Sequence, residues 1–431
     1  MSDNIQLPDI SNLYLEVTVY MMNVLWGLLG IVSIFAIAFL LSENKSKIKP
    51  RTILGGLAIQ LLFAYIVLYS TIGRRAFLWL TEKVQHIIDY AYEGIGFLFG
   101  PVLGAPSDTT GFIFAFHVLT IIIFFSSLIS VLYYLGIMQW VIRLLGGGLS
   151  KLLGTSRTES LSASANIFVG QTEAPLVIRP YIKTMTKSEL FAVMVGGLAS
   201  VAGSVLFGYA ALGVPLEYLL AASFMAAPGG LIMAKMLIPE TDTPVNPTKE
   251  DLDEGEENKP ANIIDAAARG ASDGLKLALN VGAMLLAFIA LISLINGILG
   301  GLGGAVGFGQ LSLDFILGYL FAPIAFVIGI PWSEAVAAGN LIGQKLVLNE
   351  FVAYSTFSTQ LDMFNEKSVA IISFALCGFA NLSSLAILLG GLGGLAPSRR
   401  PDIAKLGFRA ILAGTLANLL SAAIAGMFIF F

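Results

Sequence analysis

Two short polar stretches interrupt long apolar sequence, and each places a carboxylate where the composition indicates a helix at lipid depth. They are Gly170-Gln171-Thr172-Glu173-Ala174-Pro175 and Leu348-Asn349-Glu350-Phe351-Val352-Ala353-Tyr354. A charge at the centre of a bilayer costs about 3 kcal/mol or more, so such residues usually face a cavity, a partner or a substrate. One stretch lies in each half of the chain, which predicts a binding site between two structural repeats.

The composition is that of a helical membrane protein. The chain has 431 residues, of which 56% are hydrophobic and 12% charged, and its mean hydropathy is +0.84. Soluble domains carry about 25% charged residues. The lone Cys377 excludes an intrachain disulfide, and neither histidine lies in a ligand-spaced cluster. No basic run is interleaved with aromatic residues, so nucleic-acid binding is not expected.

Hydropathy predicts eight membrane-spanning helices. The positively charged loop 43–51 should be cytoplasmic, which places the N- and C-termini outside. The first apolar run, from about Val17 to Leu41, is too long for the core of a signal peptide and lacks an A-x-A-like cleavage site, so we expect a retained helix rather than a cleaved signal. The predicted spans are 17–42, 52–72, 111–137, 188–212, 215–236, 275–298, 366–390 and 406–431.

Other segments are too polar or too interrupted to span. Residues 73–100 and 138–160 suit interfacial helices on the outer and inner side, the second broken at Gly146-Gly147-Gly148. Pro175 cannot continue a regular helix, so 161–182 should form a re-entrant hairpin from inside. Residues 313–364 should form a second hairpin from outside. An amphipathic stretch near 261–274 and a glycine-rich outer loop at 297–309 complete the predicted order.

The predicted fold is therefore an all-α polytopic membrane protein with about eight transmembrane helices, two inverted re-entrant helical hairpins and interfacial helices. The expected organisation is N-terminal scaffold helices with the outer interfacial helix (1–137), a first transport repeat with hairpin 1 (138–238), an acidic cytoplasmic linker (239–261), an interfacial helix with scaffold helix six (262–312), and a second transport repeat with hairpin 2 (313–431).

Short segments of the two halves have similar sequences. Residues 165–171 (Ala-Asn-Ile-Phe-Val-Gly-Gln) are similar to 339–344 (Gly-Asn-Leu-Ile-Gly-Gln), and each hairpin precedes a helix with a small or polar interruption, at 199–204 and 378–384. Together with Gly-Gln-Thr-Glu-Ala-Pro-Leu, Asn-Glu-Phe-Val-Ala-Tyr-Ser and Cys-Gly-Phe-Ala-Asn-Leu-Ser-Ser, in this order, these motifs resemble the concentrative nucleoside transporter family, of the bacterial sodium-coupled type. The resemblance covers the chain from about Gly73 onward.

The resemblance implies a sodium-coupled nucleoside symporter of the bacterial inner membrane. It also implies a homotrimer in which a transport domain moves against a scaffold among membrane lipids, with no further cofactor. At the first hairpin, Gln171, Thr172 and Glu173 would address the nucleobase, against which Val205 and Phe379 would pack. Glu350, Asn381 and Ser384 would hold the ribose hydroxyls, and an ionised carboxylate, which only accepts hydrogen bonds, suits that role. The Na⁺ ligands would be Asn166 and Ser200 side chains with the Val169 and Val201 carbonyls.

Other interpretations of these residues stay open from the sequence. Asn166 and Ser200 could be helix-packing residues, and Glu173 and Glu350 could form structural ion pairs with Arg179 or Lys345. A raised carboxylate pKa at Glu173 or Glu350 would allow proton coupling instead of sodium coupling. Paired acids could also serve an intramembrane enzyme, although no nucleophile or metal cluster accompanies them. A channel needs neither inverted hairpins nor a specific amide.

Deleting residues 241–258 should leave nucleoside uptake unchanged, because this acidic, proline-bearing segment carries none of the motifs and has the composition of a solvated linker. Uptake of labelled nucleoside into cells, normalised to the amount of transporter in the membrane, measures this. A large loss in a well-expressed deletion would show that the linker constrains a moving part.

Overall fold

The described protein is entirely helical in its regular structure, as the sequence predicts. The computed structural model describes residues 10–100, 113–245 and 260–429, and all its regular elements are helices. Within these residues, seven helical segments are long and apolar enough to cross a membrane. Two further helices, Leu313–Val327 and Trp332–Val347, are bent by 116° at their junction and form either an eighth, broken span or a re-entrant segment. The predicted all-α polytopic fold with about eight spans is confirmed.

The helices follow the predicted order along the chain. The first part contains α1 (Ile10–Leu40), η1 (Lys45–Lys47), α2 (Pro50–Ala64), the π-helical η2 (Tyr65–Tyr69), α3 (Thr71–Phe99), α5 (Phe114–His117), α6 (Leu119–Tyr134), α7 (Ile137–Leu153), α8 (Arg157–Ala165), η3 (Ala174–Tyr181), α9 (Lys187–Ala199), α10 (Gly203–Ala211) and α11 (Leu216–Leu237). The second part contains α12 (Ile263–Ala305), α13 (Leu313–Val327), α14 (Trp332–Val347), α15 (Glu350–Ser358), η5 (Leu361–Met363), α16 (Glu366–Leu376), α17 (Leu382–Leu395), η6 (Pro397–Arg399) and α18 (Arg400–Phe428).

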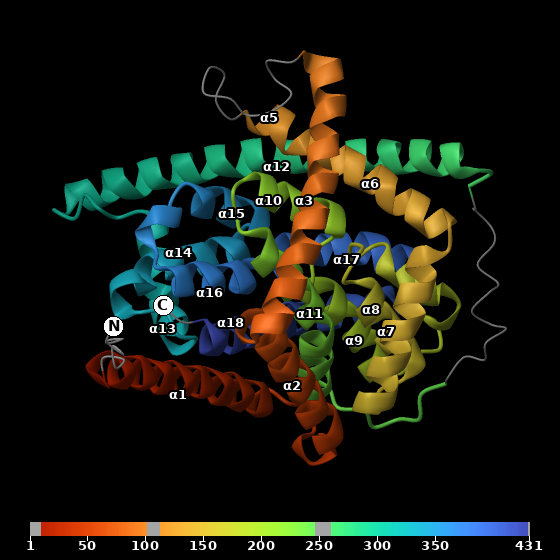
Figure 1. Cartoon of the computed structure of the whole chain (residues 1–431), viewed down its shortest axis with the longest axis horizontal. Helices are drawn as coiled ribbons and strands as arrows, with labels where there is room; N and C mark the ends of the chain where they lie inside the picture. Colours follow the sequence, from red (N-terminus) through yellow and green to blue (C-terminus); the bar gives the residue numbers. More distant parts are fainter. Residues whose placement is uncertain (1–9, 101–112, 246–259, 430–431) are drawn as a thin grey trace, which may run out of the picture.

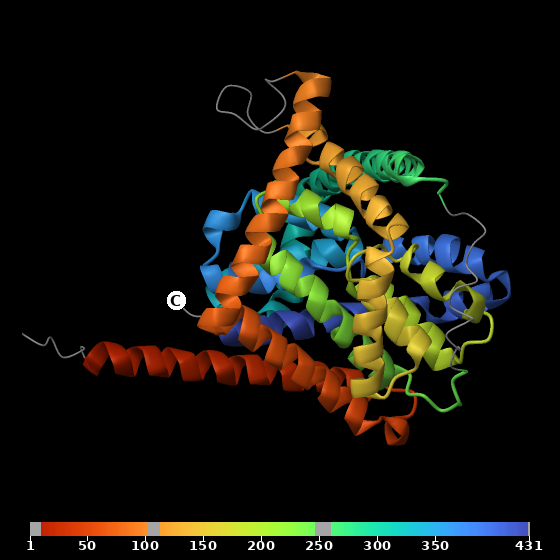
Figure 2. The same ribbon diagram turned by 45° about the vertical axis from the view of Figure 1, so that its right-hand side comes forward.

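Two long helices lie along opposite edges of the molecule, with the interrupted helices between them. Figure 1 shows α1 along one edge and α12 along the other, while α3 crosses the direction of both. The most extensive helix pair is α6 with α12, whereas α1 packs against α18 and α2 against α11. In Figure 2, α12 is seen nearly end-on and α1 projects away from the rest. The first turn of α1 and the last turn of α18 lie on the same side of the molecule.

The centre of the molecule is formed by α9, α11 and α18, most of whose side chains are buried. These helices are apolar around most of their circumference, which is typical of helices enclosed by others. Polar side chains fix where helices begin. Ser156 with Glu159 and Thr186 with Glu189 form capping boxes at the starts of α8 and α9, each satisfying backbone N–H groups that have no partner in the helix.

Four helix interruptions meet inside this centre, as the sequence predicts. Hairpin 1 is formed by α8 and η3, and hairpin 2 by α14 and α15. The spans that follow them are split, the first between α9 and α10 and the second between α16 and α17. Backbone hydrogen bonds join the interruptions: the N–H of Gly203 donates to the carbonyl of Phe168 at 3.1 Å, and the N–H of Phe379 to that of Ser200 at 3.0 Å. Hairpin 1 and both split spans are therefore directly connected.

Two glycine-rich segments are wrongly predicted as helix breaks. The outer loop expected at 297–309 is helical as far as Ala305, so that α12 is one continuous helix that also includes the amphipathic stretch expected near 261–274. Glycine costs about 1 kcal/mol relative to alanine in a helix, but a helix is the way to satisfy backbone groups away from water. The helix α7 likewise runs through Gly146, where the absence of a side chain admits the backbone of Leu161 on α8.

The last span also begins earlier than predicted. It starts at Arg400 rather than near 406, so Arg400 and Lys405 lie in α18 and not in a loop. Pro401 sits in its first turn, where a proline needs no N–H partner and its fixed φ favours a helix. Of the acidic linker, residues 246–259 lie outside the described residues, as do 1–9 and most of the segment joining α3 to α5.

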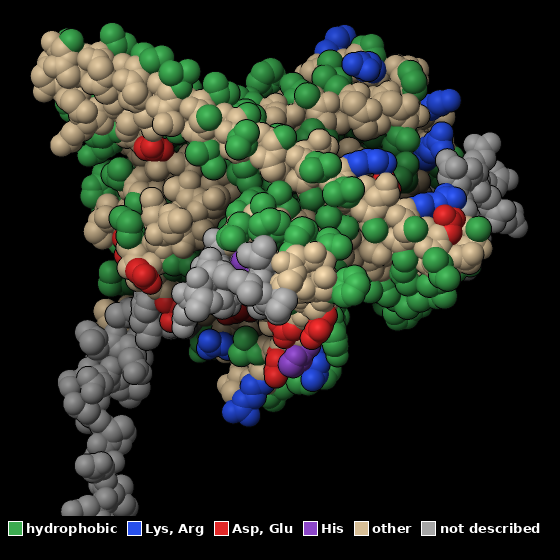
Figure 3. All heavy atoms as spheres, turned by 90° about the horizontal axis from the view of Figure 1, so that it is seen from above, with side chains coloured by type: hydrophobic (Ala, Val, Ile, Leu, Met, Phe, Trp, Pro, Cys, Tyr) green, Lys and Arg blue, Asp and Glu red, His purple; other side chains and the backbone are tan. Residues whose placement is uncertain are grey.

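Apolar side chains cover much of the surface formed by α12. Leu279, Leu286 and Leu302 expose 62%, 78% and 62% of their surface. Figure 3 shows this side from above, with charged side chains gathered towards its edges. A surface of this kind suits contact with lipid or with other apolar helices.

Replacing Gly339 with alanine should destabilise the protein by about 1–3 kcal/mol, because it overpacks a tight helix contact. A Cβ atom at Gly339 on α14 would lie 2.6 Å from both the backbone nitrogen of Ala322 and the carbonyl oxygen of Gly318 on α13. Thermal unfolding in detergent measures the effect. Gly390→Ala on α17 is the matched control, since its Cβ would meet nothing within 4 Å. Equal unfolding temperatures for both variants would contradict this account of the α13–α14 contact.

Candidate functional site

One cavity in the structure is lined by all eight residues predicted to contact a substrate. They come from the tip of hairpin 1, the start of hairpin 2's second arm and the two split spans, and they are Gln171, Thr172, Glu173, Val205, Glu350, Phe379, Asn381 and Ser384. Residues separated by more than 200 positions in the sequence thus share one space. The structure brings this set together, while the role of each member remains a prediction.

Glu350 is the more deeply buried of the two carboxylates that line the cavity. It lies in the first turn of α15, where the positive end of the helix dipole stabilises an anion. Its Oε1 accepts a hydrogen bond from the hydroxyl of Tyr209 at 3.1 Å, and its Oε2 accepts one from the Nδ2 of Asn381 at 3.0 Å. Only 5% of its surface is exposed. These two donors orient the carboxylate, which keeps further lone pairs for a ligand.

Asn381 and Ser384 are positioned by the start of α17. The Oδ1 of Asn381 caps this helix by accepting from the backbone N–H of Ser384 at 2.9 Å and also accepts from the hydroxyl of Ser383 at 2.7 Å. With its oxygen used in this way, the Nδ2 group of Asn381 is directed to Glu350. The cap that begins the helix therefore also fixes a polar side chain of the cavity.

The tip of hairpin 1 contributes an amide and a second carboxylate. Gln171 is buried, and its Nε2 donates to the hydroxyl of Ser384 at 3.4 Å. Within the described part of the chain, its Oε1 has no hydrogen-bond partner. Glu173 is more exposed and accepts from the backbone N–H of Gly170 at 3.3 Å. An unpaired buried acceptor costs about 1–3 kcal/mol, so Gln171 is suited to accept a hydrogen bond from a bound ligand.

Sequence reasoning misses two contributors to this site. The side chains of Leu277, Val281 and Leu285 on α12 form the opposite wall of the cavity. Their spacing of four residues is the signal of one helix face, but it is equally typical of ordinary packing. Tyr209 on α10 is the other omission, although a hydroxyl within an apolar helix usually seeks a partner when it is buried.

The predicted Na⁺ ligands lie beside this cavity. Asn166, Val169, Ser200 and Val201 are all buried. The Oδ1 of Asn166 has no hydrogen-bond partner in the described structure, whereas its Nδ2 donates to the carbonyl of Ser162 at 2.9 Å. This side chain lies over α9 within one turn of Ser200, since a Cβ at Gly196 would be 3.3 Å from Nδ2.

This ligand set fits a small hard cation. Val169 and Val201 lie outside the helices, in hairpin 1 and in the α9–α10 interruption, where carbonyls are free of the helical hydrogen-bond pattern. An unpaired amide oxygen beside such carbonyls is an arrangement that a cation would complete. The groups of histidine, cysteine and carboxylate residues that suit a transition metal are absent from the described residues.

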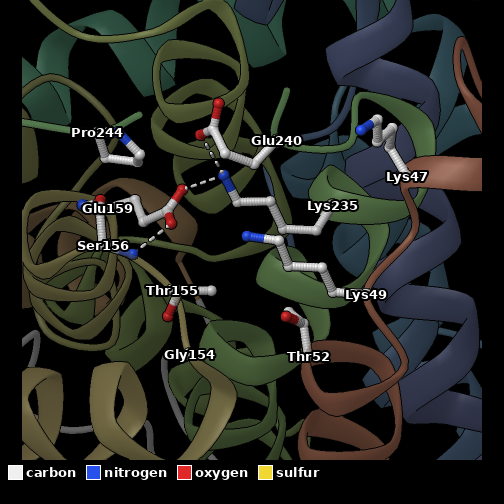
Figure 4. A pocket seen from close by; sticks show the side chains of 10 residues that line it. All are labelled: Lys47, Lys49, Thr52, Gly154, Thr155, Ser156, Glu159, Lys235, Glu240 and Pro244. Atoms are coloured by element: carbon white, nitrogen blue, oxygen red, sulfur yellow. Dashed lines mark hydrogen bonds and ion pairs between the residues drawn. The ribbon is translucent and has the colours of Figure 1, made fainter. Parts of the chain in front are cut away.

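The alternative of structural ion pairs receives no support from the geometry. The salt bridges between described residues include neither Glu173 with Arg179 nor Glu350 with Lys345. Charged pairs occur instead at a separate cavity, shown in Figure 4, where the Nζ of Lys235 lies 2.6 Å from Glu159 and 3.4 Å from Glu240. This network joins α8, α11 and the beginning of the linker.

A larger cavity adjoins the one that the predicted substrate residues line and shares Thr172, Glu173, Ala202 and Leu277 with it. Its walls carry polar groups of the N-terminal part of α12, including Asp273 and Lys276. The polar path from the tip of hairpin 1 therefore runs towards the end of α12 that follows the linker.

Comparison with known proteins shows the family of this chain. Models described as Na⁺ dependent nucleoside transporter N-terminus and C-terminus match residues 29–102 and 218–426, and a nucleoside recognition model named Gate matches 115–216. The chain is 52% identical to the nucleoside permease NupC of Helicobacter pylori over 94% of this chain and 98% of that protein. The chain belongs to the Na⁺-dependent nucleoside transporter family. It is also 64% identical to the uncharacterized transporter YutK of Bacillus subtilis, over 95% of this chain and all of that protein.

Solved structures of this family have the same fold. CNTnw in an inward-facing substrate-bound state is 55% identical, with a TM-score of 0.89 over 94% of this chain and 98% of that one. A CNTnw variant in an outward-facing state has a TM-score of 0.91 at 55% identity, over 95% and 99%. The family consists of nucleoside transporters, so this chain is a transporter and not an intramembrane enzyme.

Glu350→Gln should weaken nucleoside binding by about ten- to a hundred-fold, because a lost charge-assisted hydrogen bond costs about 1.5–3 kcal/mol. Equilibrium binding of labelled uridine to purified protein measures this. Glu334→Gln is the matched control, since Glu334 lies on α14 but bonds Asn365 away from the cavity. Wild-type affinity in a correctly folded Glu350→Gln protein would show that the Glu350 carboxylate does not contribute to nucleoside binding.

Proposed function

We propose that this protein is a sodium-coupled symporter that brings nucleosides such as uridine into the cell by an elevator-type alternating-access mechanism. The observation that carries the proposal is that residues of both hairpins and both split spans line one cavity. Sites of this kind, formed by discontinuous helices between inverted repeats, bind substrate near the middle of the membrane.

The chemistry of the cavity suits the two halves of a nucleoside. Glu350 and Asn381 bring an oriented carboxylate and an amide to one region, which would hold the ribose hydroxyls together with Ser384. Gln171, Thr172 and Glu173 would address the base, with Val205 and Phe379 against its faces. A site that hydrogen-bonds a hydroxyl discriminates strongly against an analogue without one, because its buried polar groups are then left unpaired.

Sodium is the proposed coupling ion. Asn166 and Ser200 do not titrate near neutral pH, so this ligand set can carry a metal cation but not a transported proton. The hydrogen bond from Gly203 to Phe168 ties the cation ligands of hairpin 1 to the α9–α10 interruption. Na⁺ binding would thus order the hairpin tip that carries Gln171 and prepare it for the nucleoside.

In the proposed transport cycle, the unit that carries both hairpins, residues 138–238 and 313–431, moves against the scaffold helices α6 and α12. The apolar wall formed by Leu277, Val281 and Leu285 allows such sliding, because it makes no directional bond to the cavity's polar groups. We further propose a homotrimer in the bacterial inner membrane, with both termini outside. The exposed apolar side chains of α12 suit contact with lipid and with neighbouring protomers.

Proton coupling is the second candidate. It would use Glu173 or Glu350 as the proton carrier and would require that the carboxylate change its proton affinity between the two facing states. The unpaired Oδ1 of Asn166 favours sodium, since proton coupling gives that buried oxygen no partner.

Uptake of labelled uridine into proteoliposomes should collapse when Na⁺ is replaced by choline at fixed pH, and a proton gradient without Na⁺ should not restore it. Asn166→Ala should raise the half-saturating Na⁺ concentration by about tenfold, as the loss of about 1.4 kcal/mol from one ligand implies. Uptake that is driven by pH and indifferent to Na⁺ would overturn sodium coupling in favour of the second candidate.

A further inference from the structure

Lys345 is a buried lysine that the proposed mechanism does not use. It lies near the end of α14, in the first arm of hairpin 2, and 2% of its surface is exposed. Its Nζ donates to the carbonyl oxygen of Ala375 at 2.8 Å and to the Oδ1 of Asn418 at 2.6 Å. Burying a charge is costly unless surrounding groups compensate it. The hydrogen-bond partners of Lys345 therefore indicate which kind of group this buried position can bind.

These partners differ from those of Lys235, which are carboxylates, and from those of Lys367, which are one amide oxygen and an aromatic ring. Lys235 lies between the carboxylates of Glu159 and Glu240. Lys367 donates to the Oδ1 of Asn23 at 2.7 Å and lies over the ring of Trp26. The salt bridges between described residues include none to Lys345, whose two partners are neutral oxygens. Neutral carbonyl and amide oxygens are the ligands by which transporters hold a monovalent metal ion.

The place of Lys345 in the fold is the C-terminal end of a half-helix. Ala375 is the next-to-last residue of α16, and the last four carbonyls of a helix lack intrahelical partners and carry its negative dipole end. The Nδ2 of Asn418 donates to the carbonyls of Cys377 at 2.8 Å and Ala199 at 2.6 Å. These two bonds direct its Oδ1 to Lys345, so the ammonium group is held between two neutral oxygens at the end of α16.

The first repeat has a corresponding position at the end of α9. There, the side chain of Asn166 lies over Gly196 and Gly197 in the last turn of α9, and its Oδ1 has no hydrogen-bond partner among the described residues. Each hairpin thus directs one polar side chain to the end of the half-helix that follows it. Hairpin 1 supplies an oxygen, which needs a cation between itself and the carbonyls. Hairpin 2 supplies an ammonium group, which is itself the cation.

We propose that the ammonium group of Lys345 is a tethered cation whose place at the end of α16 is comparable to that of the proposed sodium site at the end of α9, although Lys345 is not the sequence counterpart of Asn166. The second repeat therefore needs no coupling ion of its own. Shortening this side chain would leave an oxygen-lined space that binds a monovalent metal ion. The inference rests on the proposed sodium coupling for the site with which Lys345 is compared.

Lys345→Ala and Lys345→Met separate this role from simple packing. Alanine leaves the oxygens and an open space, so this variant should bind about two Na⁺ per protomer where the wild type binds about one, because saturation counts sites. Methionine fills the space without charge and should bind about one. The measurements are ²²Na⁺ bound to purified protein at saturation and the unfolding temperature at rising Na⁺ in choline. The slope of unfolding temperature against log Na⁺ should be about twofold steeper for alanine than for methionine.

Lys367→Ala is the matched control, because it removes a buried lysine from the other end of α16 and should leave the Na⁺ count unchanged. Equal Na⁺ dependence for the alanine and methionine variants would overturn the inference. An alanine variant that folds only in Na⁺ would support it, whereas one that fails to fold in Na⁺ as well as choline, beside a folded methionine variant, would overturn it. A wild type that binds no Na⁺ would refute sodium coupling, while a site gained in Lys345→Ala alone would still support the role of Lys345.

Discussion

The structure depends on one constraint, which is that every backbone polar group in its apolar interior needs a partner. Four helix interruptions lie in that interior, two at hairpin tips and two within spans. Each exposes N–H and carbonyl groups that water cannot reach in a bilayer. The fold meets the constraint by bringing the interruptions together, as the bonds from Gly203 to Phe168 and from Phe379 to Ser200 show. The site exists where it does because these unsatisfied ends converge.

The same constraint explains the types of side chain at the site. Asn349 and Asn381 cap the helices α15 and α17 through their Oδ1 atoms, as any helix start in an apolar setting requires. The Nδ2 of Asn381 is then available to Glu350. Both asparagines also line the cavity, so helix capping and the cavity wall draw on the same residues. A substitution at either asparagine would change the start of a helix and the cavity at once.

The sequence predicts the interrupted part of this fold well, because an interruption in apolar sequence must be marked by polar or helix-breaking residues. Pro175, Glu350 and Asn381 each mark one. The continuous part is predicted less well. The glycines of α12 are typical of a loop in water, and only the cost of unpaired backbone in an apolar setting keeps them helical. The wall of Leu277, Val281 and Leu285 carries no local signal that distinguishes a cavity from ordinary packing.

Asn418 couples the two repeats mechanically. One amide group holds the ends of α9 and α16 through bonds of 2.6 and 2.8 Å. A hydrogen bond of this length is largely lost when its atoms separate to about 3.6 Å. A shift of about one ångström by either half-helix end relative to Asn418 would therefore break its bond to this side chain and uncouple the two ends. The two repeats are thus held in one arrangement by a crosslink on α18, the last helix of the fold. Whatever stabilises one end lowers the free energy of the arrangement at the other, and this coupling is reciprocal by thermodynamic necessity.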